Sequence, residues 1–194
     1  MKVKRSQVGW VFWLQWVLAS TVGLLLGFIV GFPLSFLAMD ILGERLGQSF
    51  GGIVFGIGVG VLQWLVLRRR VTGVGWWVLT SAAGCYGIIQ AMFLGFPESA
   101  EMSYVSLLGL TVVVALGGAV TGILQWLVLR RQVSRAGWWV LASTVGWGLS
   151  MGVSIAIPSG ADDNLLQLAV TGAVLGVVTG AALVWLLRQP VPEA

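Results

Sequence analysis

Pairs of carboxylates are the residues whose type and spacing would best suit catalysis, because two neighbouring acids can serve as a general acid and a general base. The chain has such pairs at Asp162–Asp163 and at Glu98 and Glu101. Both pairs stand in short polar stretches between long apolar segments, where acidic residues also fix membrane topology and solubility. We interpret them as topology and solubility charges and expect no catalytic role.

Residue types that the sequence lacks restrict the chemistry further. There is no histidine, and Cys85 is the one cysteine, so the commonest haem ligand, the spacing of metal-cluster cysteines and a Cys–His nucleophile pair are all missing from the sequence. The long apolar segments contain no Asp, Glu, Lys or Arg, and proton relays or carboxylate-bound cations inside a membrane need such groups. We therefore predict a protein that is not an enzyme and that binds no metal or other cofactor.

Two glutamines are the polar side chains best placed for a role inside the apolar segments. Gln63 and Gln125 occupy the same position of a repeated phrase, which reads GVLQWLVLRRRVTGVGWWVL from Gly60 and GILQWLVLRRQVSRAGWWVL from Gly122. A glutamine buried in lipid can hydrogen-bond a neighbouring helix, or it can line the mouth of a solute path. The third repeat has Leu183 at this position, which favours interhelical bonding over a ring of selectivity residues.

The same phrase combines arginine with tryptophan at what we expect to be the membrane edge. One interpretation is a site for anionic lipid headgroups, in which the arginines hold phosphate and the tryptophans hold the start of the acyl chain. Its residues would be Arg68, Arg69, Arg130, Arg131, Trp64 and Trp126. The simpler interpretation is a belt of interfacial indoles with arginine anchors, since ten of the eleven tryptophans lie near the arginine clusters and only Trp147 lies deeper.

These residues must be positioned by membrane helices, because only 9% of the chain is charged, against roughly 25% in a soluble domain. Six segments free of Asp, Glu, Lys and Arg are long enough to cross a hydrocarbon core ~30 Å thick, and none alternates as membrane strands do. They run over 8–32, 50–67, 75–96, 103–129, 136–157 and 164–187. We predict an all-α integral membrane protein with six transmembrane helices, and we expect a break at Pro33 followed by a short amphipathic piece to Gln48.

The charges orient the helices across the membrane. Ten bases lie in the N-terminal run, in the second-to-third and fourth-to-fifth connections and near the C-terminus, with Glu193 the single acid on that side. The opposite connections hold six acids and one base, Arg45. By the positive-inside rule both termini are cytoplasmic, in a cytoplasmic or thylakoid-type membrane. The bases are spread over four short clusters rather than one groove or helix face, so the pI near 10 does not indicate nucleic-acid binding.

The repeated phrase divides a single transmembrane domain, 1–194, into three tandem helical hairpins at about 1–70, 71–132 and 133–194. Residues 16–23 and 139–146 both read WVLASTVG, which extends the repeat to the first hairpin. Hairpins of one topology in series predict a compact bundle with pseudo-threefold symmetry about the membrane normal.

Glycines spaced four apart recur on the returning helix of each hairpin. Residues four apart share one helix face, and a face without side chains lets two backbones approach closely in lipid. The residues are Gly52, Gly56, Gly60, Gly118, Gly122, Gly172, Gly176 and Gly180. We interpret them as helix-packing seams; the alternative is that three glycine faces line a central path open to a solute.

The phrase QWLVLRR followed by GWWVLAS resembles multi-pass membrane proteins of bacteria, mainly of cyanobacteria and other filamentous phototrophs, in which such hairpins recur in tandem. The resemblance covers nearly the whole chain through its three repeats, and it implies a multi-pass helical protein of a bacterial inner membrane. It brings no activity, and so it implies no catalytic or binding residues. The third hairpin departs from the phrase at VWLLRQP, where the glutamine and two of the three arginines are missing.

Two functions fit these features. The first is a non-enzymatic accessory, assembly or anchoring module that packs with lipids, with another membrane protein or with a second copy of itself. The second is a passive channel or facilitator for a small uncharged solute through the glycine-lined interior, with Gln63 and Gln125 near its inner mouth. A continuous axial gap wider than about 3 Å would favour the channel, and a close-packed axis would favour the module. A third idea, an apolar pigment such as a carotenoid bound among the tryptophans, predicts a coloured protein.

Overall fold

Helices account for nearly all of the chain that the computed structural model describes, which is residues 8–95, 104–157 and 164–189. No strand occurs in these ranges. The helices are α1 (Trp10–Leu42), α2 (Glu44–Leu67), α3 (Trp76–Gly95), α4 (Tyr104–Leu129), α5 (Trp138–Ala156) and α6 (Asn164–Arg188). The predicted all-helical fold is confirmed.

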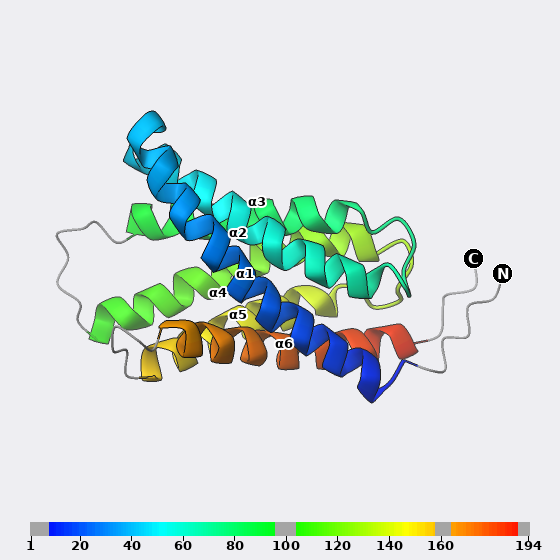
Figure 1. Cartoon of the computed structure of the whole chain (residues 1–194). Helices are drawn as coiled ribbons and strands as arrows, with labels where there is room; N and C mark the ends of the chain where they lie inside the picture. Colours follow the sequence, from blue (N-terminus) through cyan, green and yellow to red (C-terminus); the bar gives the residue numbers. More distant parts are fainter. Residues whose placement is uncertain (1–7, 96–103, 158–163, 190–194) are drawn as a thin grey trace.

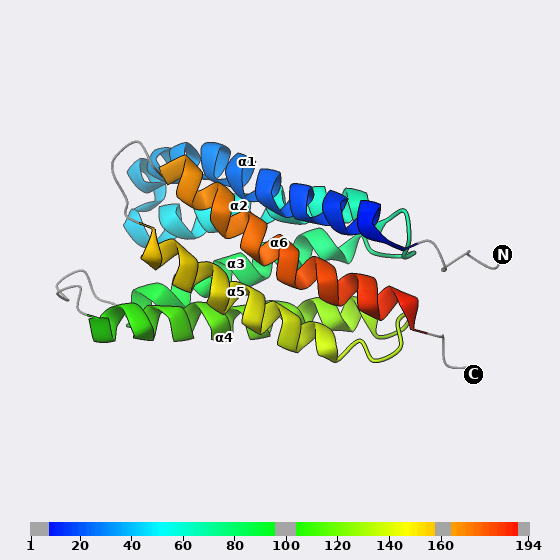
Figure 2. The same ribbon diagram turned by 90° about the horizontal axis from the view of Figure 1, so that it is seen from below.

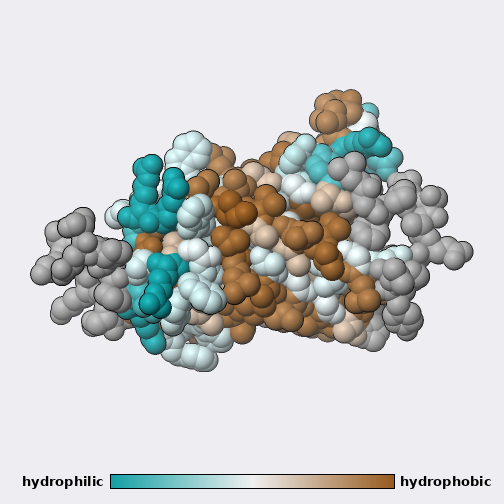
Figure 3. All heavy atoms as spheres, turned by 180° about the vertical axis from the view of Figure 1, so that it is seen from behind, coloured by the Kyte–Doolittle hydropathy of each residue, from teal (hydrophilic) through white to brown (hydrophobic). Residues whose placement is uncertain are grey.

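The outer surface of the helices is apolar, as expected of a protein solvated by lipid. Five helices, α1, α2, α4, α5 and α6, are long and apolar enough to cross a membrane. Large apolar side chains point away from the bundle along their length, for example Leu108, Leu116 and Leu166. Figure 3 shows a hydrophobic band across the middle of the molecule with hydrophilic residues gathered toward its two ends. The fold is therefore that of an integral membrane protein, while a sixth span through α3 stays a prediction.

The six helices form a closed ring in chain order. Each helix packs against the next along the chain, and α6 returns to pack against α1 (Figures 1 and 2). No other pair of helices makes a backbone contact within the described residues. A ring of this kind surrounds a central axis, and the side chains that fill this axis decide what can pass along it.

The first hairpin departs from the sequence prediction at Pro33. The expected break is wrong, because α1 continues through Pro33 for 33 residues in all and only Gly43 separates it from α2. That residues 34–48 lie on the membrane interface stays a prediction. A proline inside a helix costs about 3 kcal/mol, through a lost hydrogen bond and a ring clash. Close packing against α2 offsets this cost on both sides of Pro33, since a Cβ on Gly31 would lie 2.9 Å from the carbonyl oxygen of Gly51 and one on Gly51 2.6 Å from Cβ of Ser35. Gly43 makes the turn at φ 83°, a conformation that favours glycine.

The arginine-bearing turns between α2 and α3 and between α4 and α5 lie side by side. Gln132 joins them, because its Oε1 accepts hydrogen bonds from the backbone N–H of Thr72 at 3.0 Å and from the Thr72 hydroxyl at 2.9 Å. Val71 and Val133, at equivalent places in the two turns, are buried beneath the bundle. The turns therefore close this end of the ring as well as connecting the helices.

Candidate functional site

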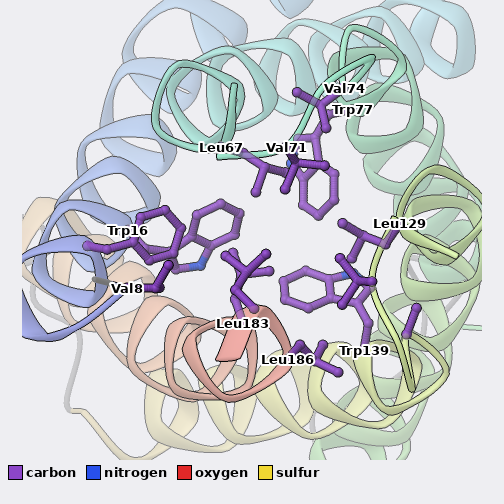
Figure 4. Packing of buried hydrophobic residues seen from close by; sticks show 14 residues of the cluster. Val8, Trp16, Leu67, Val71, Val74, Trp77, Leu129, Trp139, Leu183 and Leu186 are labelled. Carbon is purple, nitrogen blue, oxygen red and sulfur yellow. The ribbon is translucent and has the colours of Figure 1, made fainter. Parts of the chain in front are cut away.

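Three tryptophans meet on the axis at the arginine end of the bundle. Trp16 of α1, Trp77 of α3 and Trp139 of α5 are 0%, 0% and 2% exposed, and Figure 4 shows them pointing toward one another. Their ring centroids are 5.8, 6.0 and 5.4 Å apart, and the two pairs that involve Trp16 are edge-to-face. We call these three residues the tryptophan triad.

Leucines from the returning helices complete this layer. Leu67 of α2, Leu129 of α4 and Leu183 of α6 are each fully buried in the same cluster as the triad (Figure 4). Val71 and Val133 from the turns belong to the same cluster. The triad and these leucines occupy the centre of the ring. This end of the axis is closed.

The inward direction of the triad corrects the predicted interfacial belt. Trp10, Trp76 and Trp138 do lie outside, with exposed fractions of 69%, 67% and 54%. Trp77 and Trp139, each the next residue along its helix, are buried instead. Consecutive residues of an α-helix point roughly 100° apart, so both members of a Trp-Trp pair cannot face lipid equally. The belt is therefore divided between the lipid boundary and the core.

Gln63 connects three helices beneath the triad. Its side chain is buried on α2, where its Oε1 accepts a hydrogen bond from the indole Nε1 of Trp77 on α3 at 3.1 Å. Its Nε2 donates to the hydroxyl of Ser20 on α1 at 3.1 Å. The glutamine predicted to bond between helices or to line a path thus lies between α1 and α3, with its oxygen and its nitrogen both engaged.

Gln125 repeats this arrangement one hairpin later. Its Oε1 accepts from Nε1 of Trp139 on α5 at 2.9 Å, and its Nε2 donates to the hydroxyl of Ser81 on α3 at 3.1 Å. Ser81 donates in turn to the backbone carbonyl of Trp77 at 2.9 Å. The same three side-chain types, tryptophan, glutamine and serine, therefore join α2 to α3 and α1, and α4 to α5 and α3.

The third junction, between α6 and α1, uses a different bond. Leu183 stands where the other hairpins have glutamine, so Nε1 of Trp16 donates to the hydroxyl of Thr179, one turn away on α6, at 3.0 Å. Thr179 donates to the backbone carbonyl of Leu175 at 2.6 Å. No buried side-chain nitrogen or oxygen in the described parts of the chain is left without a partner.

A small cavity lies next to the triad on the axis. Its volume is about 20 Å³, and its lining includes Gln63, Gln125, Ser81, Thr121, Thr179 and Cys85. That volume holds about one water molecule, which needs two to four polar partners such as these. Beyond it, Leu24, Val59 and Leu175 form a second buried apolar cluster. The cavity therefore lies between two apolar layers and has a mixed lining, in which polar side chains stand beside Val59, Leu175 and Trp147.

The arginines predicted to hold lipid phosphate are presented on the outside of the same end. Arg68 lies over the ring of Trp64 with its guanidinium carbon 4.8 Å from the centroid, and Arg130 lies over Trp126 at 5.3 Å. Arg69 and Arg131, the next residues, are exposed. In the third hairpin Arg188 instead donates from Nε to the backbone carbonyl of Val8 at 2.8 Å.

The four-spaced glycines lie where one hairpin meets the next. A Cβ on Gly56 of α2 would lie 2.7 Å from Cα of Ala82 on α3, and one on Gly176 of α6 would lie 2.8 Å from Cα of Val17 on α1. Close approaches to the following hairpin recur at Gly52, Gly60, Gly118, Gly122, Gly172 and Gly180. These glycines face the neighbouring helix in the ring, and a larger residue would have to displace the end of the Ile89 side chain at Gly52 and less mobile atoms of the neighbouring helix at the other positions.

Comparisons with known protein families, with curated proteins and with solved structures find no match. The resemblance to bacterial tandem-hairpin proteins therefore stays a prediction. The acid pairs Glu98 and Glu101, and Asp162 and Asp163, lie outside the described residues. What the geometry brings together is the tryptophan triad, its two glutamines and a set of arginines at one end of the bundle.

Proposed function

We propose that this protein is a non-enzymatic membrane module, an accessory, assembly or anchoring subunit that packs with membrane partners or lipids. The observation behind this proposal is the closed axis. The triad and the buried leucines Leu67, Leu129 and Leu183 close the centre of the ring at the arginine end, and a closed axis favours a packing module over an open channel.

The distribution of polar groups supports the same proposal. The glutamines, serines and threonines inside the ring bond to one another or to backbone, so their hydrogen-bonding capacity serves the fold. The groups left to meet other molecules are the apolar outer faces and the arginine turns. Both suit partners that lie in or on the membrane.

The finer topology belongs to this proposal. We infer six spans in three hairpins related by pseudo-threefold symmetry, with both termini and the arginine turns cytoplasmic. Support comes from the closed ring, from the repeated Trp–Gln–Ser bonds at two junctions and from the gathering of the arginine turns at one end.

A second candidate, a passive channel for a small uncharged solute, is favoured only by the cavity of about 20 Å³ beside Gln63 and Gln125. To conduct, the triad would have to swing off the axis and break the bonds of its three indole N–H groups. We therefore rank the channel below the module.

One experiment compares the two. The full-length protein is purified from its native membrane in mild detergent, and the proteins, lipids and pigments that accompany it are identified by mass spectrometry. A membrane protein or lipid retained in fixed stoichiometry is the expected result. If nothing is retained, and liposomes containing the protein pass water or glycerol faster than empty liposomes, the module is replaced by the channel.

A further inference from the structure

A groove opens on the outside of the bundle where α1 begins and α2 ends. Its volume is about 330 Å³, and it is lined by Val11, Phe12, Gln15, Val66, Arg69 and Arg70. Its inner wall reaches the tryptophan triad through Phe12, whose ring stacks on Trp16 with centroids 6.5 Å apart, but none of the hydrogen bonds of the axial layer involves its residues. Its size is within the range of pockets that hold small organic groups.

Within the part of the chain that the structure describes, the charge of the groove is positive and has no acidic side chain beside it. Arg69 and Arg70 both contribute to its wall. Among the described residues the acids are Asp40 and Glu44, which lie at the far end of the first hairpin. Two guanidinium groups with a neutral amide beside them suit phosphate oxygens, because arginine donates paired N–H groups in a planar fork. The start of α1 beside the groove adds a favourable dipole for an anion.

The rest of the groove is apolar and sits at the membrane edge. Val11 is 68% exposed, and Phe12 and Val66 complete an apolar floor. A free phosphate would gain nothing from this floor, whereas a phospholipid would place its phosphate on the arginines and the start of an acyl chain on the valines. We propose that this groove binds one anionic phospholipid.

At the equivalent positions of the other hairpins, the described side chains contact one another instead. In the second hairpin Gln132 replaces Arg70 and is bonded to Thr72, across the place that the groove would occupy. In the third, the rings of Trp138 and Trp185 meet edge-to-face with centroids 6.2 Å apart. The lipid site is therefore specific to the first hairpin, although the arginine-rich phrase occurs in two.

The test measures lipid binding to the purified full-length protein in mild detergent by native mass spectrometry, with phosphatidylglycerol as the probe and phosphatidylcholine as the neutral control. The double variant R69Q/R70Q should bind the first phosphatidylglycerol about 30-fold more weakly, and R70Q alone about fivefold more weakly. R70Q gives the first turn the LRRQV sequence that the second hairpin already has, so it is expected to fold. The matched control R130Q/R131Q removes the same charge from the second hairpin and should leave this affinity within about twofold.

Three results would overturn the site: unchanged phosphatidylglycerol affinity in R69Q/R70Q, an equal loss in R130Q/R131Q, or displacement of the lipid by millimolar inorganic phosphate, which would make it a free-anion site. The inference rests on the proposed function only in placing the protein in a lipid bilayer. If lipid binding follows the prediction while no protein partner is retained from the native membrane, the lipid site stands and the partner-binding role fails.

Discussion

The junction between α2 and α3 and the junction between α6 and α1 do the same work with different side chains. At the first, Gln63 accepts from Trp77 and donates to Ser20, so one amide ties three helices. At the other, Leu183 fills the space and Thr179 accepts from Trp16. The comparison teaches that the buried indole N–H must be satisfied, while the group that satisfies it can change.

Removal of a triad indole should give the largest effect and tests whether the junctions depend on it equally. Trp77→Ala leaves a cavity and also strips Gln63 of its donor, so we expect a loss of about 3–5 kcal/mol in the free energy of unfolding. Trp16→Ala should cost less, because Thr179 keeps its bond to Leu175. Titration with SDS in mixed micelles, followed by circular dichroism, measures both. The lipid-facing Trp76→Ala is the control, and an equal loss there would contradict a core role for the triad.

Enlargement of a seam glycine comes next in size. Gly56→Leu places side-chain atoms against the backbone of α3, and we expect a loss of about 1–3 kcal/mol by the same assay. Gly176→Leu does so against α1 and should cost as much if the junctions are equivalent. Gly87→Leu is the matched control, since nothing lies within 4 Å of a Cβ at that position of α3. Comparable losses in all three variants would argue against packing seams.

Replacement of the two glutamines tests whether the α2–α3 and α4–α5 junctions depend equally on their amide. Gln63→Leu orphans the indole of Trp77, because the residue one turn back on α2 is Val59, and should cost about 1–3 kcal/mol. Gln125→Leu should cost only about 0.6 kcal/mol, because Thr121 stands one turn back and can accept from Trp139 as Thr179 does from Trp16. Unfolding of the two variants measures the difference.

A rescue variant then sharpens this result. Val59→Thr in the Gln63→Leu background supplies the missing hydroxyl and is expected to recover most of the lost stability. Val59→Thr alone is the control. Failure of the rescue, or equal losses in the two glutamine variants, would show that the bonds at the three junctions are not interchangeable.

The arginine stacks should give the smallest effect. Arg68→Gln removes a cation from the ring of Trp64 at an exposed position, and such a contact contributes about 0.5–1 kcal/mol. Arg130→Gln should do the same over Trp126. The same unfolding titration gives both values, and a loss above 2 kcal/mol for either variant would assign these arginines a structural role that the geometry does not indicate.

The sequence was sufficient for the helical fold, because long uncharged runs between charge clusters leave few alternatives in lipid. It also placed Gln63 and Gln125 at equivalent positions, since the repeated phrase contains them. It failed at Pro33, where local preference for a break is outweighed by packing of α1 on α2, a contact that composition does not reveal.

The inward tryptophans were missed although a signal for them exists. Trp16 is followed four and seven residues later by Ser20 and Gly23, and the same spacing of tryptophan, serine and glycine recurs from Trp77 and from Trp139. Positions i, i+4 and i+7 share one helix face, so small and polar partners on that face indicate a buried stripe. The preference of indole for the membrane interface alone predicts tryptophans at the lipid boundary. Only the spacing of the serines and glycines distinguishes the buried tryptophans from the exposed ones.

Closure of the ring also sets the order in which the three tryptophan bonds can form during synthesis. The partners Trp77 and Gln63 are 14 residues apart, as are Trp139 and Gln125, so each bond can form soon after the second of its two helices leaves the ribosome. Trp16 and Thr179 are 163 residues apart. The indole of Trp16 therefore has no partner until the last helix has been inserted. Of the three bonds, the one between Trp16 and Thr179 closes the longest loop and carries the largest entropic cost of loop closure. The core is therefore complete only when synthesis of the chain is complete. A chain that stops before α6 exposes Trp16 and the face of α1 that packs against α6.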